Sequence, residues 1–546
     1  MSAHEMSTAD DDDDGVSQAI PHPYGVKPLG NLLTAASGTV NARDSGLGYL
    51  GGLDDEQALA MLHYFDAPTL AQFAICSRGS YVWAHCIELW RALVLQTFGG
   101  RFLWAGSWKA TFAASSLQGL GKSADAKQQR HLPMAVPNFY SDVLFQAHHV
   151  ATLPISPSWL GGQDIPQEDA ASMSVEHFKC KYEQPNHPVL ISGLADQWPA
   201  FGKWGVSALA ATHPNADVTC GHFDVQFSTY AAYCASINGE PGAQPAWDDQ
   251  PLYLFDKHFA GRLHGTTGDF SVPPYFTEDL FSVLGTERPH YRWLIAGPKA
   301  SGSSFHVDPN GTSAWNAVLT GAKKWIMYPP SSPPPGVHPS ASGAEVAAPL
   351  SLTEWCESFY WQHAEVKRAA WAAAMARGED PLSCGKVPLE FIAPAGSVLF
   401  VPSGWWHMAL NLENDTMALT QNFVSSANLS TVMHFLKYKP QQVSGVSEER
   451  CSKLWKEFQT ALERERPSVW AVYEASLANA KQAANVKAAQ YRRTNATWGS
   501  TVAGVKRTRE ANATPGGHAP KQAAAGGCSD QEPAVFSFGF SFSEGD

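Results

Sequence analysis

The chain has 546 residues, of which 44% are hydrophobic and 11% aromatic, and its formal net charge is −13. This length exceeds one compact core and predicts two or three domains with tails, while the apolar content excludes a wholly disordered chain. The acidic balance argues against non-specific binding to nucleic-acid phosphates, although it leaves a local basic groove open.

The nine Cys residues are scattered and contain no CxxC pair. An odd, dispersed set argues against a disulfide framework and favours reduced thiols in the nucleus or cytoplasm. The polar start of the chain, residues 1–14, predicts no signal peptide. No apolar run is long enough to cross a bilayer, so we expect no membrane partner.

The first part of the chain changes character twice. Residues 1–45 are rich in Ser, Asp, Gly and Ala, which predicts a disordered acidic lead-in. In residues 46–115 apolar side chains recur at three- and four-residue steps, which predicts a domain of short amphipathic helices. Asp66 is expected to cap one of them. The polar residues 116–135 are predicted to be a linker.

Residues 136–430 carry short β-like runs separated by Pro and Gly, which predicts a barrel or sandwich. The clearest runs are 188–192, 291–296, 324–328 and 397–401. An insert at about 329–390 interrupts them, with a Pro-rich stretch followed by a predicted helix at roughly 351–377.

The C-terminal part is predicted to contain helices at 431–495, which could form a homodimer interface, and a disordered tail at 496–546. A small basic cluster at 506–509 is compatible with a nuclear address, although such clusters are common. We therefore expect a nuclear or cytoplasmic location, with the nucleus favoured.

The sharpest chemical pattern is His306-Val307-Asp308 on a predicted strand, with His407 far downstream. Side chains two apart on a strand point to the same face, so His306 and Asp308 can converge on one cation. Two imidazoles and one carboxylate leave coordination positions open, as in the facial triad of non-haem Fe(II) oxygenases. Zinc accepts the same ligands, but no HExxH motif supports a zinc hydrolase.

The pattern alone is weak, because the chain has 20 His, but its surroundings resemble a known family. Residues 304–325, 400–412 and 419–423 closely resemble the JmjC domain, especially that of JmjC arginine demethylases and lysyl hydroxylases. The likeness covers about 170–430. It implies an α+β fold with a mainly β core, a double-stranded β-helix (the cupin-like JmjC barrel) with flanking helices.

The resemblance also implies a role for each matching residue. His306, Asp308 and His407 match the Fe(II) ligands of an enzyme that uses 2-oxoglutarate and O₂ as co-substrates. The matching 2-oxoglutarate contacts are Lys323, Thr420, Asn316, Ser303 and Tyr253, the first two at the distal carboxylate. Lys323 suits an anion as a point charge. Lys324 is its neighbour on the strand and is expected to face the opposite way, into solvent.

The helical domain near the start resembles an F-box, with Leu53, Leu59, Leu62 and Leu70 at apolar positions of that motif. Asp54 stands where the motif usually has Pro. The resemblance implies docking to a Skp-type adaptor of an SCF ubiquitin ligase. The alternative is that these helices only pack on the oxygenase domain.

The leading prediction is an Fe(II)- and 2-oxoglutarate-dependent dioxygenase that hydroxylates a protein side chain, in a histone or RNA-processing protein for example. Lysyl hydroxylation and N-methyl demethylation both stay open, because demethylation begins with the same hydroxylation. The alternative is a non-catalytic F-box adaptor that recruits a client protein. A small-molecule oxygenase or cell-surface receptor finds less support, because no membrane or targeting segment is evident.

Overall fold

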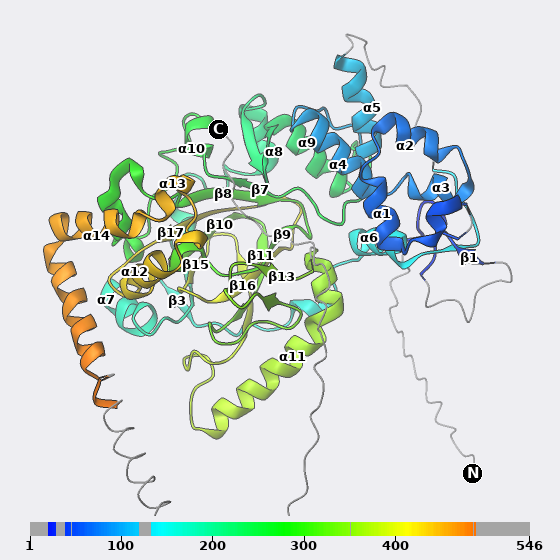
Figure 1. The fold of residues 1–546 in the computed structure, drawn as a ribbon. Helices are drawn as coiled ribbons and strands as arrows, with labels where there is room; N and C mark the ends of the chain where they lie inside the picture. Colours follow the sequence, from blue (N-terminus) through cyan, green and yellow to red (C-terminus); the bar gives the residue numbers. More distant parts are fainter. Residues whose placement is uncertain are drawn as a thin grey trace, which may run out of the picture.

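The computed structural model describes residues 20–28, 39–44, 46–119, 133–349, 351–483 and 485–487. Most of the predicted lead-in at 1–45, the basic cluster at 506–509 and the predicted tail at 496–546 therefore lie outside the described residues. Figure 1 shows a helical module on one side of a central β-structure and the C-terminal helices on the other side.

The N-terminal module is a group of short helices. They are α1 (Asp55–Leu62), α2 (Ala67–Ala74), α3 (Arg78–Trp83), α4 (Ile87–Phe98), α5 (Trp108–Gly119) and α6 (Asp142–Thr152). The first three begin at capping side chains: Asp54, Asp66 and Ser77 each accept a hydrogen bond from the backbone N–H three residues on. The cap predicted at Asp66 is confirmed.

Part of the expected lead-in is folded onto this module. Strand β1 (Val40–Asn41) pairs in parallel with β2 (Phe139–Tyr140), and Val26 and Ala42 are buried. The expectation of a disordered segment from 1 to 45 is therefore wrong for residues 20–28 and 39–44. The local composition could not predict this burial, because the apolar neighbours of these side chains lie elsewhere in the chain. Helix α5 likewise runs four residues into the expected linker.

Eight strands in two four-stranded antiparallel groups form the barrel. The smaller sheet has the order β14 (Leu389–Pro394), β11 (Ala322–Tyr328), β16 (Trp406–Asn411) and β9 (Gly302–His306). The opposing group has the order β15 (Val398–Val401), β10 (Ser313–Thr320), β17 (Thr416–Phe423) and β8 (Arg292–Gly297). This is the double-stranded β-helix that the resemblance implies, and the predicted strands at 291–296, 324–328 and 397–401 are confirmed as part of it.

The larger sheet extends beyond the barrel at both edges and is nine-stranded. On one edge lie β4 (Val189–Ser192) and β3 (Gln167–Asp169), and on the other lie β7 (Leu254–Asp256), β5 (Asp217–Cys220) and β6 (Phe223–Gln226). Inside the barrel, Ala314 and Val318 of β10 share one apolar cluster with Trp325 and Met327 of β11. The two sheets therefore face each other across a buried interior, as alternating side chains require.

The insert between β11 and β14 contains β12 (His338–Pro339), β13 (Val346–Ala347) and helix α11 (Leu352–Ala376), which confirms the predicted helix. Trp355 of α11 packs edge-to-face on Phe305 of β9, with ring centroids 4.8 Å apart. The helix thus covers the outer face of the smaller sheet. Lys324 points to this covered face and is only 1% exposed, so the expectation that it faces solvent is wrong.

Further helices cover the remaining surfaces. They are α7 (Val175–Phe178), α8 (Val206–Thr212), α9 (Phe227–Ile237), α10 (Phe259–Arg262), α12 (Leu429–Tyr438), α13 (Glu448–Cys451) and α14 (Leu454–Glu465), and residues 467–483 are also helical. Within the described part of the chain, every helix is too short or too polar to cross a lipid bilayer.

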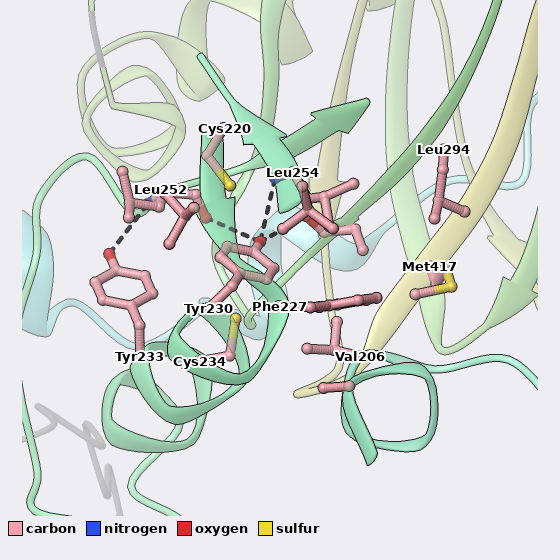
Figure 2. Close-up of a cluster of buried hydrophobic side chains, with 14 of the residues drawn as sticks. Val206, Cys220, Phe227, Tyr230, Tyr233, Cys234, Leu252, Leu254, Leu294 and Met417 are labelled. Carbon is pink, nitrogen blue, oxygen red and sulfur yellow. Dashed lines mark hydrogen bonds between the residues drawn. The ribbon is translucent and has the colours of Figure 1, made fainter. Parts of the chain in front are cut away.

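One apolar core runs from the helical module into the larger sheet, and Figure 2 shows the part of it around α9. The hydroxyl of Tyr230 accepts a hydrogen bond from the Leu254 backbone N–H and lies 2.8 Å from the Ala296 carbonyl. The hydroxyl of Tyr233 donates to Asp248, which also accepts from the Trp108 indole of α5. The module and the barrel are therefore joined through a buried polar and apolar interface.

Candidate functional site

Two histidines meet where β9 and β16 pair. His306 and His407 are direct partners in the register, and their ring centroids lie 4.2 Å apart. Asp308 follows two residues after His306, beyond the end of the strand. One ligand atom from each of these three residues lies within 4.8 Å of the others, and no other such group of three is found among the described residues. The sequence-predicted triad is thus brought together.

Backbone carbonyls orient both imidazoles. Nδ1 of His306 lies 2.7 Å from the Ser304 carbonyl, and Nδ1 of His407 lies 2.9 Å from the Trp405 carbonyl. An Nδ1–H that donates to a carbonyl leaves the Nε2 lone pair of each ring available to a metal ion.

The electrostatic surroundings of Asp308 and His407 suit a bound cation. Burial raises the pKa of Asp308 to about 6, partly offset by His306, and its buried Oδ2 atom has no hydrogen-bond partner among the described residues. Burial and the neighbouring His306 hold the pKa of His407 well below its usual range, so this imidazole is neutral. Imidazole nitrogens from two histidines and a buried carboxylate oxygen fit a divalent metal, and this ligand set fits Fe(II).

The turn after Asp308 is fixed by side-chain amides. Asn310 adopts a left-handed conformation (φ 57°) and exchanges two hydrogen bonds with the backbone of Ser444. The hydroxyl of Thr312 donates to the Pro309 carbonyl and accepts from Asn422. These contacts hold the carboxylate of Asp308 in place before any metal binds.

A second group of polar side chains lies inside the barrel. Lys323 is fully buried, and its Nζ atom donates to the Tyr253 hydroxyl at 2.8 Å. Ser303 forms a hydrogen bond with the same hydroxyl. Burial lowers the pKa of Lys323 to about 7, because it removes the ammonium group from water. The structure thus brings Lys323, Tyr253 and Ser303 together in the arrangement expected for binding an anionic group.

Asn316 and Thr420 are direct partners on β10 and β17. Oδ1 of Asn316 is buried and finds no hydrogen-bond partner in the part of the chain that the structure describes. The Thr420 hydroxyl donates to the Trp315 carbonyl at 3.0 Å. Asn316 lies two residues from both Ala314 and Val318, whose side chains face the barrel interior, so its side chain faces the interior too. The buried amine and this unpartnered amide fit a ligand with several oxygen atoms, such as 2-oxoglutarate, and the individual contacts stay predictions.

Asn422 was not assigned a role from the sequence, although it lies two residues after Thr420. It is buried, donates to Thr312, and its hydrogen bond lowers the pKa of Asp308. The available signal was strand alternation, because residues 420 and 422 share the inward face of β17. We assign Asn422 to the support of the Asp308 carboxylate.

Comparisons with known proteins agree with this geometry. The model of the cupin-like domain family matches residues 175–428. The chain is 41% identical over 463 residues to the arginine-specific demethylase JMJ22 of Arabidopsis thaliana, a match that covers 84% of this chain and 85% of that protein.

Two other relatives match shorter parts of the chain. The bifunctional arginine demethylase and lysyl-hydroxylase psr-1 of Caenorhabditis briggsae is 34% identical over 56% of this chain and 70% of its own length. The human 2-oxoglutarate and iron-dependent oxygenase JMJD4 is 30% identical over 36% of this chain and 42% of its own length. The chain therefore belongs to the cupin-like JmjC family of iron(II)- and 2-oxoglutarate-dependent oxygenases.

Proposed function

We propose that this enzyme hydroxylates a side chain of a protein substrate, either a lysyl carbon or the methyl carbon of an N-methylated arginine or lysine. The observation that carries the proposal is the convergence of His306, Asp308 and His407 within 4.8 Å inside the barrel. The names of the similar proteins, an arginine demethylase and a lysyl hydroxylase, support this substrate class.

The metal ligands and the polar side chains inside the barrel have separate roles in the proposed reaction. His306, Asp308 and His407 would hold Fe(II), which when bound supplies O₂ activation coupled to the conversion of 2-oxoglutarate to succinate and CO₂. The Lys323 ammonium and the hydroxyls of Tyr253 and Thr420 bind and orient the co-substrate. The apolar walls around them exclude water, which protects the reaction from side products.

The same site serves hydroxylation and demethylation. A hydroxyl placed on an unactivated lysyl carbon is stable, whereas a hydroxyl on an N-methyl carbon gives a hemiaminal that loses formaldehyde. The substrate therefore decides the product.

Mass spectrometry of histone and splicing-factor peptides tests the proposal, after incubation with the enzyme, Fe(II), ascorbate and 2-oxoglutarate. We expect a gain of one oxygen or the loss of a methyl group, with matching succinate, and neither change with His306→Ala. Succinate formation in which no peptide is ever modified would contradict a protein substrate.

A separate proposal concerns the N-terminal module. We propose that it docks a Skp-type adaptor, because Tyr49, Tyr64 and Ile75 are large apolar side chains left exposed on it, Tyr64 by 91%. A purified adaptor should be retained by the wild-type chain and lost with the double variant Tyr64→Asp and Ile75→Asp. Trp361→Asp, which places the same charge on exposed helix α11 of the insert, is the control. Equal retention by all three proteins would contradict the docking.

We also propose a homodimer through the C-terminal helices and a nuclear location. Tyr438 and Val472 are exposed there, which supports a contact with a second copy. Light scattering of the purified chain should give twice the monomer mass, and the double variant Tyr438→Asp and Val472→Asp should return it to the monomer mass.

The proposed nuclear location is tested separately. A tagged chain should accumulate in nuclei, and it should lose this preference when the basic side chains of the 506–509 cluster are replaced.

A further inference from the structure

Lys324 is the second member of the pair Lys323-Lys324 on β11, one of the two inner strands of the smaller sheet. Side-chain alternation sends Lys323 into the barrel and Lys324 to the outer face beneath α11. Nζ of Lys324 lies 2.8 Å from Oε2 of Glu390 on β14 and also donates to the Gly161 carbonyl. Two adjacent buried lysines thus have two separate sets of partners on opposite faces of one strand.

Helix α11 completes the partners of Glu390. Lys367 donates to the other carboxylate oxygen, and the Tyr360 hydroxyl donates to Oε2 at 2.7 Å. Nζ of Lys367 also lies 2.6 Å from Oδ2 of Asp164. Two ammonium groups therefore face two carboxylates in a closed network that joins the insert to the barrel.

The carboxylate of Glu390 stays ionised in this setting. Burial by itself would raise the pKa of Glu390, but His363, Lys324 and Lys367 outweigh it and hold the pKa well below its usual range. His363 lies 3.8 Å from Glu390, and its Nδ1 atom is 2.8 Å from the Tyr328 hydroxyl on β11. The network therefore contacts β11 at two points on its outer face.

The neighbouring lysines make the register of β11 ambiguous at the level of sequence. A slip of one residue would turn every side chain of the strand to the other face, so that Lys324 would enter the barrel and Lys323 would leave it. In the observed register Lys324 pairs with Ile392, and Glu390 is its diagonal neighbour on the same face. A fixed negative charge on the outer face favours this register, because only one of the two lysines can reach it.

We propose that Lys324 is a positioning residue for co-substrate binding, because its ion pair with Glu390 holds β11 in the register that directs Lys323 into the barrel. The inference rests on the proposed function, since it takes Lys323 as the group that binds the distal carboxylate of 2-oxoglutarate. Buried ion pairs often add little net stability, and the best-supported role of buried polar groups is to specify register. The insert helix takes part in the same role through Lys367 and Tyr360.

The test compares Lys324→Met, Lys324→Arg and Glu390→Gln with a matched control. The control, Arg91→Met, removes the cationic partner of the buried Asp248, at the interface between the helical module and the larger sheet and away from Lys323 and Lys324. Two quantities are measured on the full chain loaded with Mn(II): the Kd for 2-oxoglutarate by calorimetry, and the reductive methylation of the Lys323 amine by peptide mass spectrometry.

We expect Lys324→Met and Glu390→Gln to weaken 2-oxoglutarate binding by at least about 10-fold, because a slipped strand withdraws the binding amine. Lys324→Met should also expose Lys323 to methylation. Lys324→Arg should restore both properties because it keeps the charge, and Arg91→Met should change neither, even where it lowers the melting temperature.

Loss of thermal stability in Lys324→Met and Glu390→Gln, with unchanged Kd and a protected Lys323, would overturn the inference. If Lys324→Met does not fold, Glu390→Gln and Lys324→Arg decide it by the Kd alone. Lys323→Met separates the two proposals. Wild-type affinity in that variant contradicts the proposed role of Lys323, whereas loss of affinity there, with wild-type affinity in both Lys324→Met and Glu390→Gln, contradicts only the role of Lys324.

Discussion

At the scale of single residues, the sequence predicted the metal ligands of the site, but it did not predict the contacts of Lys324. The spacing of His306 and Asp308 predicted a shared face, and the barrel supplies His407 as their partner. Strand alternation also predicted that Lys324 turns away from Lys323, which is correct. It could not show that this face is buried, because the partners of Lys324 there come from the distant residues 161 and 390.

The pH dependence of co-substrate binding follows from Lys323. Its pKa of about 7 means that the free enzyme holds this amine protonated below pH 7 and increasingly neutral above it. Since only the ammonium attracts a carboxylate, the Kd for 2-oxoglutarate should be flat below pH 7 and rise with pH above it. Calorimetry between pH 6 and pH 9 checks this, and Lys323→Met should remove the dependence. A flat profile in the wild type would contradict it.

Asn422 permits a prediction about metal affinity. Partners that orient a metal ligand are typically worth about 10- to 100-fold in metal affinity. Asn422→Ala should therefore weaken Fe(II) binding by about 10-fold or more, as measured by competition with a chelator. Asn238→Ala is the control, because Asn238 lies outside the barrel at the end of α9. Equal weakening in both variants would argue for a general effect on folding.

At the scale of elements, the strands and the insert helix were predictable because their patterns are local. Runs of apolar residues between Pro and Gly predicted the strands at 188–192 and 397–401, and the structure contains β4 and β15 there. The order of the strands in the two sheets was not local information. It came from the family resemblance, because pairing between distant strands leaves no periodic signal in the chain.

The insert helix offers a stability test with a control on the same helix. Trp355 is buried against Phe305, and its indole N–H donates to the Pro335 carbonyl. Trp355→Ala should lower the free energy of unfolding by about 3–5 kcal/mol, because it leaves a large cavity. Trp361 is 58% exposed, so Trp361→Ala should change it by less than about 0.5 kcal/mol. Urea titration of both variants measures the difference, and similar losses would contradict the assigned packing.

At the scale of the whole molecule, the helical module and the barrel behave as one folded body. Arg101 forms two hydrogen bonds with Asp217 on β5, and the Trp104 indole donates to Ser236 on α9. The sequence left open whether these helices form a separate docking domain or pack on the oxygenase. The shared core shows that the helices pack on the oxygenase domain. Docking of a further partner is a separate proposal.

A shared core predicts cooperative unfolding. Calorimetry of the full chain should show the module and the barrel unfolding in one transition, because neither buries its apolar face without the other. Arg91→Met should shift that transition to lower temperature, because it leaves Asp248 without its cationic partner. Two well-separated transitions, with only the smaller one moved by Arg91→Met, would show that the module folds independently.

The central claim is that His306, Asp308 and His407 hold one iron ion on which co-substrate binding depends. The most direct measurement is anaerobic titration of the purified chain with Fe(II), followed by the binding of 2-oxoglutarate. We expect one iron ion per wild-type chain and 2-oxoglutarate binding only after iron is added, with both lost in Asp308→Ala and His407→Ala variants that keep the wild-type circular dichroism. Wild-type iron stoichiometry in both folded variants would contradict the claim.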